Sequence, residues 1–250
     1  MVKTSLPRIV VKSLEAILGD SFCITFVQRL PSRRNEVYRI EGVIPPNNQI
    51  QRYVVKFFHS PGIAQEASIL QQALELNIDV PRIVGTTSTV LIMDYIDAPN
   101  LCDLITIYPA PHYAHLLATW FAQYHTAFAR SKELVLLKGD ARIRNFLIAP
   151  DRVVGVDFEE SQTGAYTQDL AEVCGSILDT SPFFTPAKQV LCKEFLKWYS
   201  RFRPITNLER LTSETTIRLI DVLDATALRR GQPSELLRHI ASLKHGMFQL

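Results

Sequence analysis

The sequence predicts an α+β protein in which a strand-rich N-terminal part is followed by a mostly helical C-terminal part. Up to residue 96, apolar residues gather in short runs rich in β-branched and aromatic side chains, which is typical of strands. Beyond residue 99 they recur at helical spacing. We therefore expect an N-terminal lobe over residues 1–96 and a C-terminal lobe over residues 97–250.

The N-terminal lobe opens with a predicted helix over residues 6–18, which ends at Gly19-Asp20. A second amphipathic helix follows Gly62 and carries Glu66 in its first turn. The predicted strands of this lobe are 22–29, 36–41, 52–58, 82–85 and 89–95.

The C-terminal lobe is predicted to be helical except for one hairpin. Residues 112–130 have the clearest pattern, because large apolar residues follow one another there at three- and four-residue steps. The other predicted helices are 168–178, 185–202, 208–228 and 233–243.

The predicted hairpin carries the most informative polar residues of the chain. Two apolar runs, 146–149 and 153–156, are separated by Pro150-Asp151-Arg152. Pairing centred on Asp151 would set Asn145 and Asp157 opposite each other, roughly 5 Å apart. Two oxygen-bearing side chains at that separation can hold a hard cation such as Mg²⁺. Asp140 lies close enough on the entering loop to take a proton from an attacking hydroxyl.

These residues resemble the catalytic core of the protein kinase-like superfamily, most closely the aminoglycoside phosphotransferase and choline kinase-like family. The stretches Lys138-Gly139-Asp140, Asn145 and Asp157-Phe158-Glu159 are similar to that family's HGD-x-x-x-x-N and D-[FW]-[GE] motifs. The resemblance implies that Asp140 is the catalytic base, that Asn145 and Asp157 bind Mg²⁺, and that ATP donates the phosphoryl group. It also implies that Asp169 braces the catalytic loop and that His125 packs beneath it.

The resemblance extends into the N-terminal lobe and implies a two-lobed fold with an antiparallel sheet and one main helix. Lys56 lies in a strand similar to the one that presents the lysine for the ATP phosphates, and Glu66 would be its ion-pair partner. The apolar strand that reaches Asp94, together with Ile96, resembles the hinge that binds adenine. Residues 1–96 would thus bind ATP, and residues 97–250 would hold the catalytic groups and the acceptor.

Two departures from the family pattern bear on function. No glycine lies between Gly19 and Gly42, where the family usually has a glycine-rich phosphate loop. Arg33 or Arg34 could bind phosphate there, but a solvated hairpin is the alternative. Lys138 replaces the usual histidine. Together with Arg142 and Arg144 it should lower the pKa of Asp140, and these basic residues could also bind an anionic acceptor.

Three functions remain open from the sequence. The first is a kinase that transfers the γ-phosphoryl group of ATP to a hydroxyl of a small molecule, with Mg²⁺ as cofactor. The second is a catalytically degenerate kinase-like protein that binds nucleotide or serves as a scaffold. An atypical protein kinase ranks third, because nothing after Asp157 resembles the segment that closes a peptide-docking activation loop.

Composition narrows the partners. The net charge of +2 gives no reason to expect a nucleic-acid partner, and we expect no membrane association. The four cysteines show no metal-ligand spacing, which favours reduced, mostly buried thiols and a cytoplasmic protein. The sequence names neither the acceptor nor the oligomeric state.

Overall fold

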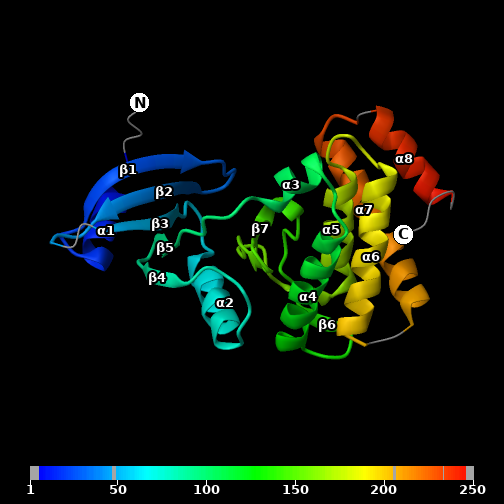
Figure 1. Cartoon of the computed structure of the whole chain (residues 1–250), viewed down its shortest axis with the longest axis horizontal. Coiled ribbons are helices and arrows are strands. Elements are labelled where there is room, and N and C mark those ends of the chain that lie inside the picture. Colours follow the sequence, from blue (N-terminus) through cyan, green and yellow to red (C-terminus); the bar gives the residue numbers. More distant parts are fainter. Residues whose placement is uncertain (1–5, 47–48, 205–206, 233, 246–250) are drawn as a thin grey trace. The chain divides into compact units, whose positions relative to one another are not determined.

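The computed structural model describes residues 6–46, 49–204, 207–232 and 234–245. The packing of the backbone divides the chain into two compact units, Met1–Asp97 and Ala98–Leu250. Figure 1 shows the elements of both units. Each unit has its own buried core.

Unit 1 contains a five-stranded antiparallel sheet with the strand order β1-β2-β3-β5-β4. Helices α1 and α2 both pack on β4 and β5. The elements are α1 (Arg8–Leu18), β1 (Cys23–Leu30), β2 (Glu36–Val43), β3 (Ile50–Phe57), α2 (Ile63–Glu75), β4 (Ile83–Thr86) and β5 (Val90–Asp94).

The two faces of the sheet have different neighbours. Val10 and Leu14 of α1 are buried in one cluster with alternate residues of the strands, among them Val55 of β3. Because successive side chains on a strand point to opposite faces, Lys56 projects from the other face. There it contacts Glu66 of α2. The alternation of β3 therefore decides that the lysine faces α2 and not α1.

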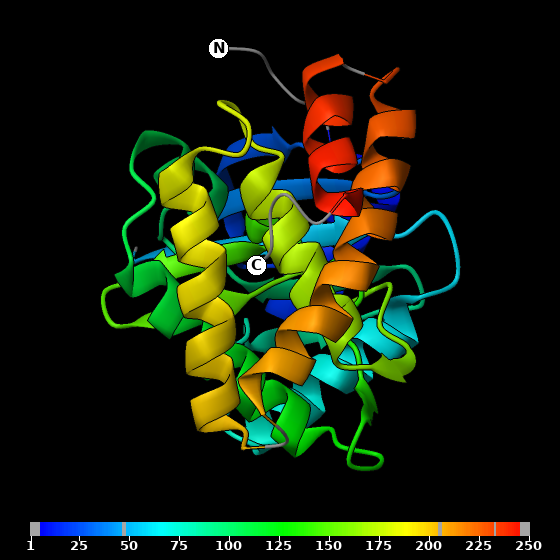
Figure 2. The same ribbon diagram turned by 90° about the vertical axis from the view of Figure 1, so that its right-hand side faces the viewer.

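Unit 2 is mostly helical. Helix α4 packs against α6, and α5 packs against α7. Figure 2 shows α8 beside the C-terminal half of α7. The helices are α3 (Leu101–Ile107), α4 (His112–Ala127), α5 (Thr167–Leu178), α6 (Pro186–Phe202), α7 (Leu208–Arg229) and α8 (Ser234–Lys244). The short strands are β6 (Leu134–Leu136), β7 (Phe146–Ala149), β8 (Arg152–Gly155) and β9 (Thr163–Ala165), which pair as β6–β9 and β7–β8.

The predicted elements agree closely with these bounds, with four differences. Helix α4 ends at Ala127, three residues before the predicted end. Helix α3 and the strands β6 and β9 were not predicted, because they are too short to show a period. The predicted start of the last helix, Pro233, lies outside the described residues.

The cysteines are free thiols, but fewer are buried than predicted. Cys174 and Cys192 are buried, Cys102 is half-buried and Cys23 is exposed. Cys23 is exposed because it begins β1, a strand at the edge of the sheet. No helix in the described part of the chain combines the length and the apolar character needed to cross a membrane.

Candidate active site

The predicted hairpin forms, but its register differs from the prediction by one residue. Phe146 pairs with Gly155 and Ala149 with Arg152, so the turn consists of Pro150 and Asp151 alone. The residue opposite Asn145 is therefore Val156, whose N–H donates to the Asn145 carbonyl at 3.0 Å. The prediction that Asn145 and Asp157 face each other across the ladder was wrong, because Arg152 joins a strand that was expected to begin at Val153.

The backbone changes direction at both ends of the hairpin. In a continued ladder a one-residue offset would send Asn145 and Asp157 to opposite faces. The chain does not continue as a strand, because Asp157 has a left-handed backbone with φ 66°. On the other side, Asn145 ends a 3₁₀ turn over Ile143–Asn145. Aspartate tolerates the left-handed region better than most residues, and such conformations gather at functional sites.

Lys138 links the Asp140 loop to the Asp157 segment through hydrogen bonds. Its Nζ donates to the backbone carbonyls of Asp140 and Asp157, at 3.0 Å each. The side chain is fully buried, and the ammonium lies over the rings of Phe146 and Phe158. Burial lowers the pKa of Lys138, against the opposing charges of Asp157 and Asp140. The suggestion that Lys138 could grip an anionic acceptor was wrong, since the ammonium is enclosed and bonded to carbonyls.

Asp140 is held on both of its carboxylate oxygens. Arg142 Nε lies 3.2 Å from Oδ1, and Arg144 Nη2 lies 2.8 Å from Oδ2. Burial raises the pKa of Asp140, but the hydrogen bond from Arg144 and the charges of Arg144, Arg142 and Lys138 outweigh it. The pKa of Asp140 is therefore below its usual value, as expected from its basic neighbours. Asp140 is therefore ionised at neutral pH and can accept a proton or orient a hydroxyl.

Asn145 is buried and faces the same loop. Its Nδ2 donates to the Asp140 carbonyl at 2.9 Å, so the amide nitrogen is used for structure. Its Oδ1 accepts no hydrogen bond from the described residues. Because hard cations prefer oxygen ligands, this orientation leaves the suitable atom for a metal.

The loop before Asp140 is fixed by α5. Asp169 accepts hydrogen bonds from the backbone N–H groups of Lys138, at 2.7 Å, and of Gly139, at 3.3 Å. His125 Nε2 lies 3.0 Å from the same carboxylate. Gly139 has φ 78°, and a Cβ there would lie 2.3 Å from the carbonyl oxygen of Glu160. The glycine is therefore required, and Asp169 and His125 brace the loop as the resemblance implies.

In unit 1, Lys56 and Glu66 form a buried ion pair. Lys56 Nζ lies 2.8 Å from Glu66 Oε2, and only 7% and 1% of the two side chains are exposed. This burial rules out an incidental pair on the surface, which was the alternative interpretation of these two residues. The lysine also lies over the Phe58 ring at 5.1 Å.

The residues expected at the hinge lie at the end of β5. The Asp94 carboxylate is bound by Arg82 through Nε at 2.8 Å, and the Asp94 N–H donates to the Arg82 carbonyl. The N–H of Asp94 is thus unavailable for a hydrogen bond to adenine. The backbone N–H and C=O of Ile96 have no hydrogen-bond partner among the described residues, so Ile96 keeps both groups open.

The expected phosphate loop is the turn between β1 and β2. Arg33 and Arg34 are exposed in this turn. Asn35 is buried, and its Oδ1 accepts a hydrogen bond from the His59 N–H at 3.3 Å. The turn is anchored by this side chain and contributes two cations, without the glycines that allow close backbone approach.

Glu172 is a site residue that the sequence did not indicate. It accepts a hydrogen bond from the Ala141 N–H at 2.7 Å, one residue after Asp140. Burial raises its pKa to about 7, and the charges of Asp169 and Asp140 add to this. Only its position on the inner side of α5, three residues after Asp169, could have drawn attention to it.

A cavity of about 280 Å³ lies beside this loop, wholly within unit 2. Arg142 joins it to Asp140, because its guanidinium contacts the carboxylate and also lines the cavity. The other lining residues are polar or small and come from α5, its C-terminal end and α7: Glu172, Ser176, Asp179, Asp221, Val222, Ala225, Thr226 and Arg229.

The sequence matches no protein-family model and no curated relative. Its structure, in contrast, is similar to solved structures of small-molecule kinases. One is the amicoumacin kinase hAmiN, with a TM-score of 0.67, 11% identity and coverage of 97% of this chain and 94% of that one. Another is a choline kinase from Cryptosporidium parvum Iowa II, with a TM-score of 0.66, 12% identity and 89% coverage of both chains.

A third similar structure is the ADP-bound aminoglycoside phosphotransferase APH(2'')-Ib, with a TM-score of 0.58, 14% identity and coverage of 95% of this chain and 97% of that one. At such low identity these similarities concern the fold. The chain has the protein kinase-like fold, in the form that aminoglycoside phosphotransferases and choline kinases share.

Proposed function

We propose that the protein is an ATP- and Mg²⁺-dependent phosphotransferase that moves the γ-phosphoryl group to a hydroxyl of a small-molecule acceptor. The observation that carries this proposal is the network around Lys138 and Asn145. Lys138 binds the carbonyls of Asp140 and Asp157, and the Asn145 amide binds the Asp140 carbonyl as well. An ordinary polar hairpin has no need for a buried lysine that links the two aspartates.

Asn145 and Asp157 are the residues that would hold the metal. The donor set fits a hard cation, because the Asn145 Oδ1 carries no competing hydrogen bond and Asp157 supplies a carboxylate. When bound, Mg²⁺ neutralises charge on the phosphates. The similar amicoumacin kinase was solved with AMP-PNP and Ca²⁺, which supports a nucleotide and a divalent cation here.

Unit 1 would bind the nucleotide. Glu66 fixes the direction of the Lys56 ammonium, as is needed to orient the α- and β-phosphates. Ile96 offers a free N–H and C=O to an adenine edge. Asp94 would contribute its carbonyl only, because its N–H is already used.

Unit 2 would bind the acceptor and align its hydroxyl. Asp140 is ionised and oriented by Arg142 and Arg144, so it can position the attacking hydroxyl and take its proton. The cavity beside Arg142 is the candidate acceptor site. Its carboxylates and guanidinium groups favour a polar acceptor with several hydrogen-bonding groups over a purely anionic one.

The test is ADP release measured against a panel of polar hydroxyl compounds, with Asp140→Ala and Asp157→Ala as variants. Asp140→Ala should lose turnover by about 10²-fold or more but still bind Mg·ATP in a thermal-shift assay. Asp157→Ala should lose the metal-dependent part of the binding as well. Wild-type turnover in Asp140→Ala would remove this residue from the mechanism.

A catalytically degenerate nucleotide-binding protein is the second candidate. It is favoured by one specific observation, that both oxygens of Asp140 are held by arginines. Mg·ATP binding without ADP release on any acceptor would support it. If neither binding nor turnover is seen, both candidates fail.

A further inference from the structure

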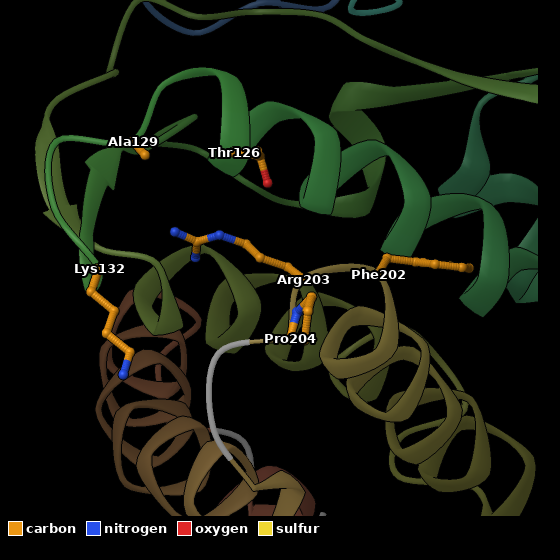
Figure 3. Close-up of a pocket in the computed structure, with 6 residues that line it drawn as sticks. All are labelled: Thr126, Ala129, Lys132, Phe202, Arg203 and Pro204. Atoms are coloured by element: carbon orange, nitrogen blue, oxygen red, sulfur yellow. The ribbon is translucent and has the colours of Figure 1, made fainter.

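A second cavity in unit 2 contains a buried arginine that forms no ion pair with a carboxylate of the described residues. The cavity has a volume of about 360 Å³ and is lined by Thr126, Ala129, Lys132, Phe202, Arg203 and Pro204. In Figure 3, Arg203 extends along this space beneath α4, and the hydroxyl oxygen of Thr126 points toward it. Arg203 is only 9% exposed, whereas most arginines lie on the surface.

The guanidinium of Arg203 is satisfied on one edge and on its face. Its Nη1 donates to the Tyr199 hydroxyl at 3.0 Å, and its Cζ lies 4.8 Å from the centre of the Tyr166 ring. No described residue accepts a hydrogen bond from Nε or Nη2. These two N–H groups share one edge of the planar group, so they can donate in parallel to two oxygens of one ligand.

The charged residues that line this cavity are both positive. Lys132 and Arg203 are the charged residues among those that line it, and neither forms an ion pair with a described residue. The neighbouring acid, Glu133, is bound by Arg210 at 3.0 Å. A buried cation without an opposing charge is costly, and an anion in the cavity would remove that cost.

A chain of buried hydrogen bonds runs from this arginine to the catalytic loop. The Tyr199 hydroxyl lies 2.9 Å from His125 Nδ1, and His125 Nε2 lies 3.0 Å from Asp169. Asp169 in turn accepts the N–H groups of Lys138 and Gly139.

The bonds of this chain have fixed directions when His125 is neutral. The Asp169 carboxylate can only accept, so His125 donates from Nε2, and its unprotonated Nδ1 accepts from the Tyr199 hydroxyl. That hydroxyl in turn accepts from Arg203, which can only donate. Burial lowers the pKa of His125 more than Asp169 raises it, which keeps the imidazole neutral as this pattern requires.

We infer that the cavity beside Arg203 is a binding site for a small oxyanion, of the phosphate or carboxylate type, whose occupancy is communicated to the catalytic loop. Such a ligand occupies the free edge of the guanidinium and is steadied by Lys132. It thereby fixes Arg203 in the orientation that donates to Tyr199. The bonds that hold Lys138 and Gly139 then open less often.

The binding part is tested by isothermal titration of the nucleotide-free protein with inorganic phosphate and, separately, with acetate. Arg203→Gln should weaken binding at least about tenfold, and Lys132→Gln several-fold. Arg201→Gln is the matched control, because Arg201 lies only two residues away, in the last turn of α6, but is exposed over Trp198. If Arg203→Gln fails to fold, the titration of Lys132→Gln tests the site, because Lys132 is exposed and its substitution should not disturb folding.

The communication part is tested by hydrogen exchange at the Lys138 and Gly139 amides, with and without the bound anion. Exchange should slow several-fold in the wild-type protein and stay unchanged in Tyr199→Phe, which keeps Arg203 but breaks the chain. Neither readout needs turnover, so a failed kinase assay leaves both intact. The proposed site is contradicted if neither anion binds, or if the affinity is unchanged in both Arg203→Gln and Lys132→Gln. An equal response in Tyr199→Phe overturns the hydrogen-bond path.

Discussion

Lys56 in strand β3 and Lys138, two residues before Asp140, are both buried lysines, yet their surroundings differ. Lys56 is paired with the carboxylate of Glu66 and lies next to a strand end. Lys138 is bonded to two backbone carbonyls and enclosed by aromatic rings. The Glu66 carboxylate balances the charge of the Lys56 ammonium and fixes its direction. The Lys138 ammonium instead holds two backbone segments together, through the carbonyls of Asp140 and Asp157. The comparison suggests that Lys56 acts on a ligand and Lys138 acts on the backbone.

The largest expected effect comes from breaking the pair in unit 1. Lys56→Met leaves the Glu66 carboxylate buried without its cation, so we expect a loss of about 3–5 kcal/mol of unfolding free energy and weaker ATP binding. The double variant Lys56→Met/Glu66→Leu should recover most of the stability but not the ATP binding. Chemical denaturation and nucleotide titration measure the two properties separately. Recovery of ATP binding in the double variant would show that Lys56 has no role toward the nucleotide.

Lys138→Met is expected to cost somewhat less stability but to affect catalysis at saturating ATP. Two carbonyls lose their donor, which suggests about 2–4 kcal/mol, and the loops of Asp140 and Asp157 lose their link. The matched control is Lys188→Met, because the buried Lys188 also binds two carbonyls, at 2.7 and 2.8 Å, outside this loop. A similar fall in kcat in both variants would mean that Lys138 contributes only general stability.

Glu172 adds a pH-dependent test, since this half-buried carboxyl group near Asp140 forms no ion pair with a described residue. Its folded pKa of about 7 lies above the usual 4.5, so the protonated form stabilises the fold. This stabilisation is fully present below about pH 4.5 and is lost as the pH rises through about 7, for a total of at most about 3 kcal/mol. Glu172→Gln should remove this slope and be the more stable protein at about pH 8. Urea melts at several pH values check this, and an unchanged slope would assign the titration to another group.

The smallest effect is expected from Arg144, which is bound to the Asp140 carboxylate. Arg144→Gln removes the hydrogen bond and the charge that lower the pKa of Asp140, so the acid limb of the kcat/KM profile should move to higher pH. Near neutral pH the rate should change by less than about tenfold, because the pair is partly solvated. Arg152→Gln, at the exposed end of the hairpin, is the control. A profile that does not move would mean that Asp140 does not set the acid limb.

Much of the fold followed from local patterns. Amphipathic spacing located α1, α2, α5, α6 and α7 to within two residues, because each helix buries one face. Alternation and β-branched runs located the strands of unit 1 to within two residues at either end. Helix α3 was missed because its seven residues span only two turns, and its start depends on the cap formed by Asn100.

The site was predictable where the chemistry is local in sequence and unpredictable where it is not. The Lys138-Gly139-Asp140 motif was recognisable because Gly139 must adopt a left-handed backbone against Glu160. The pairing of the hairpin was not, because one residue more or less in a turn changes the register without changing the pattern. The contacts of Lys138 were not predictable either, since nothing in the sequence distinguishes a lysine that binds a ligand from one that donates to backbone carbonyls.

The order and type of most secondary elements were determined by the sequence itself, because periodicity acts over short stretches of chain. The sequence also indicated the Asp140, Asn145 and Asp157 motif and the Lys56–Glu66 pair, through its resemblance to the aminoglycoside phosphotransferase and choline kinase-like family. Only the tertiary structure decided which polar groups are enclosed together. The chain from Arg203 through Tyr199 and His125 to Asp169 joins residues up to 78 positions apart, counting from 203 to 125. Such contacts arise when helices pack and exclude water, and no local pattern records them.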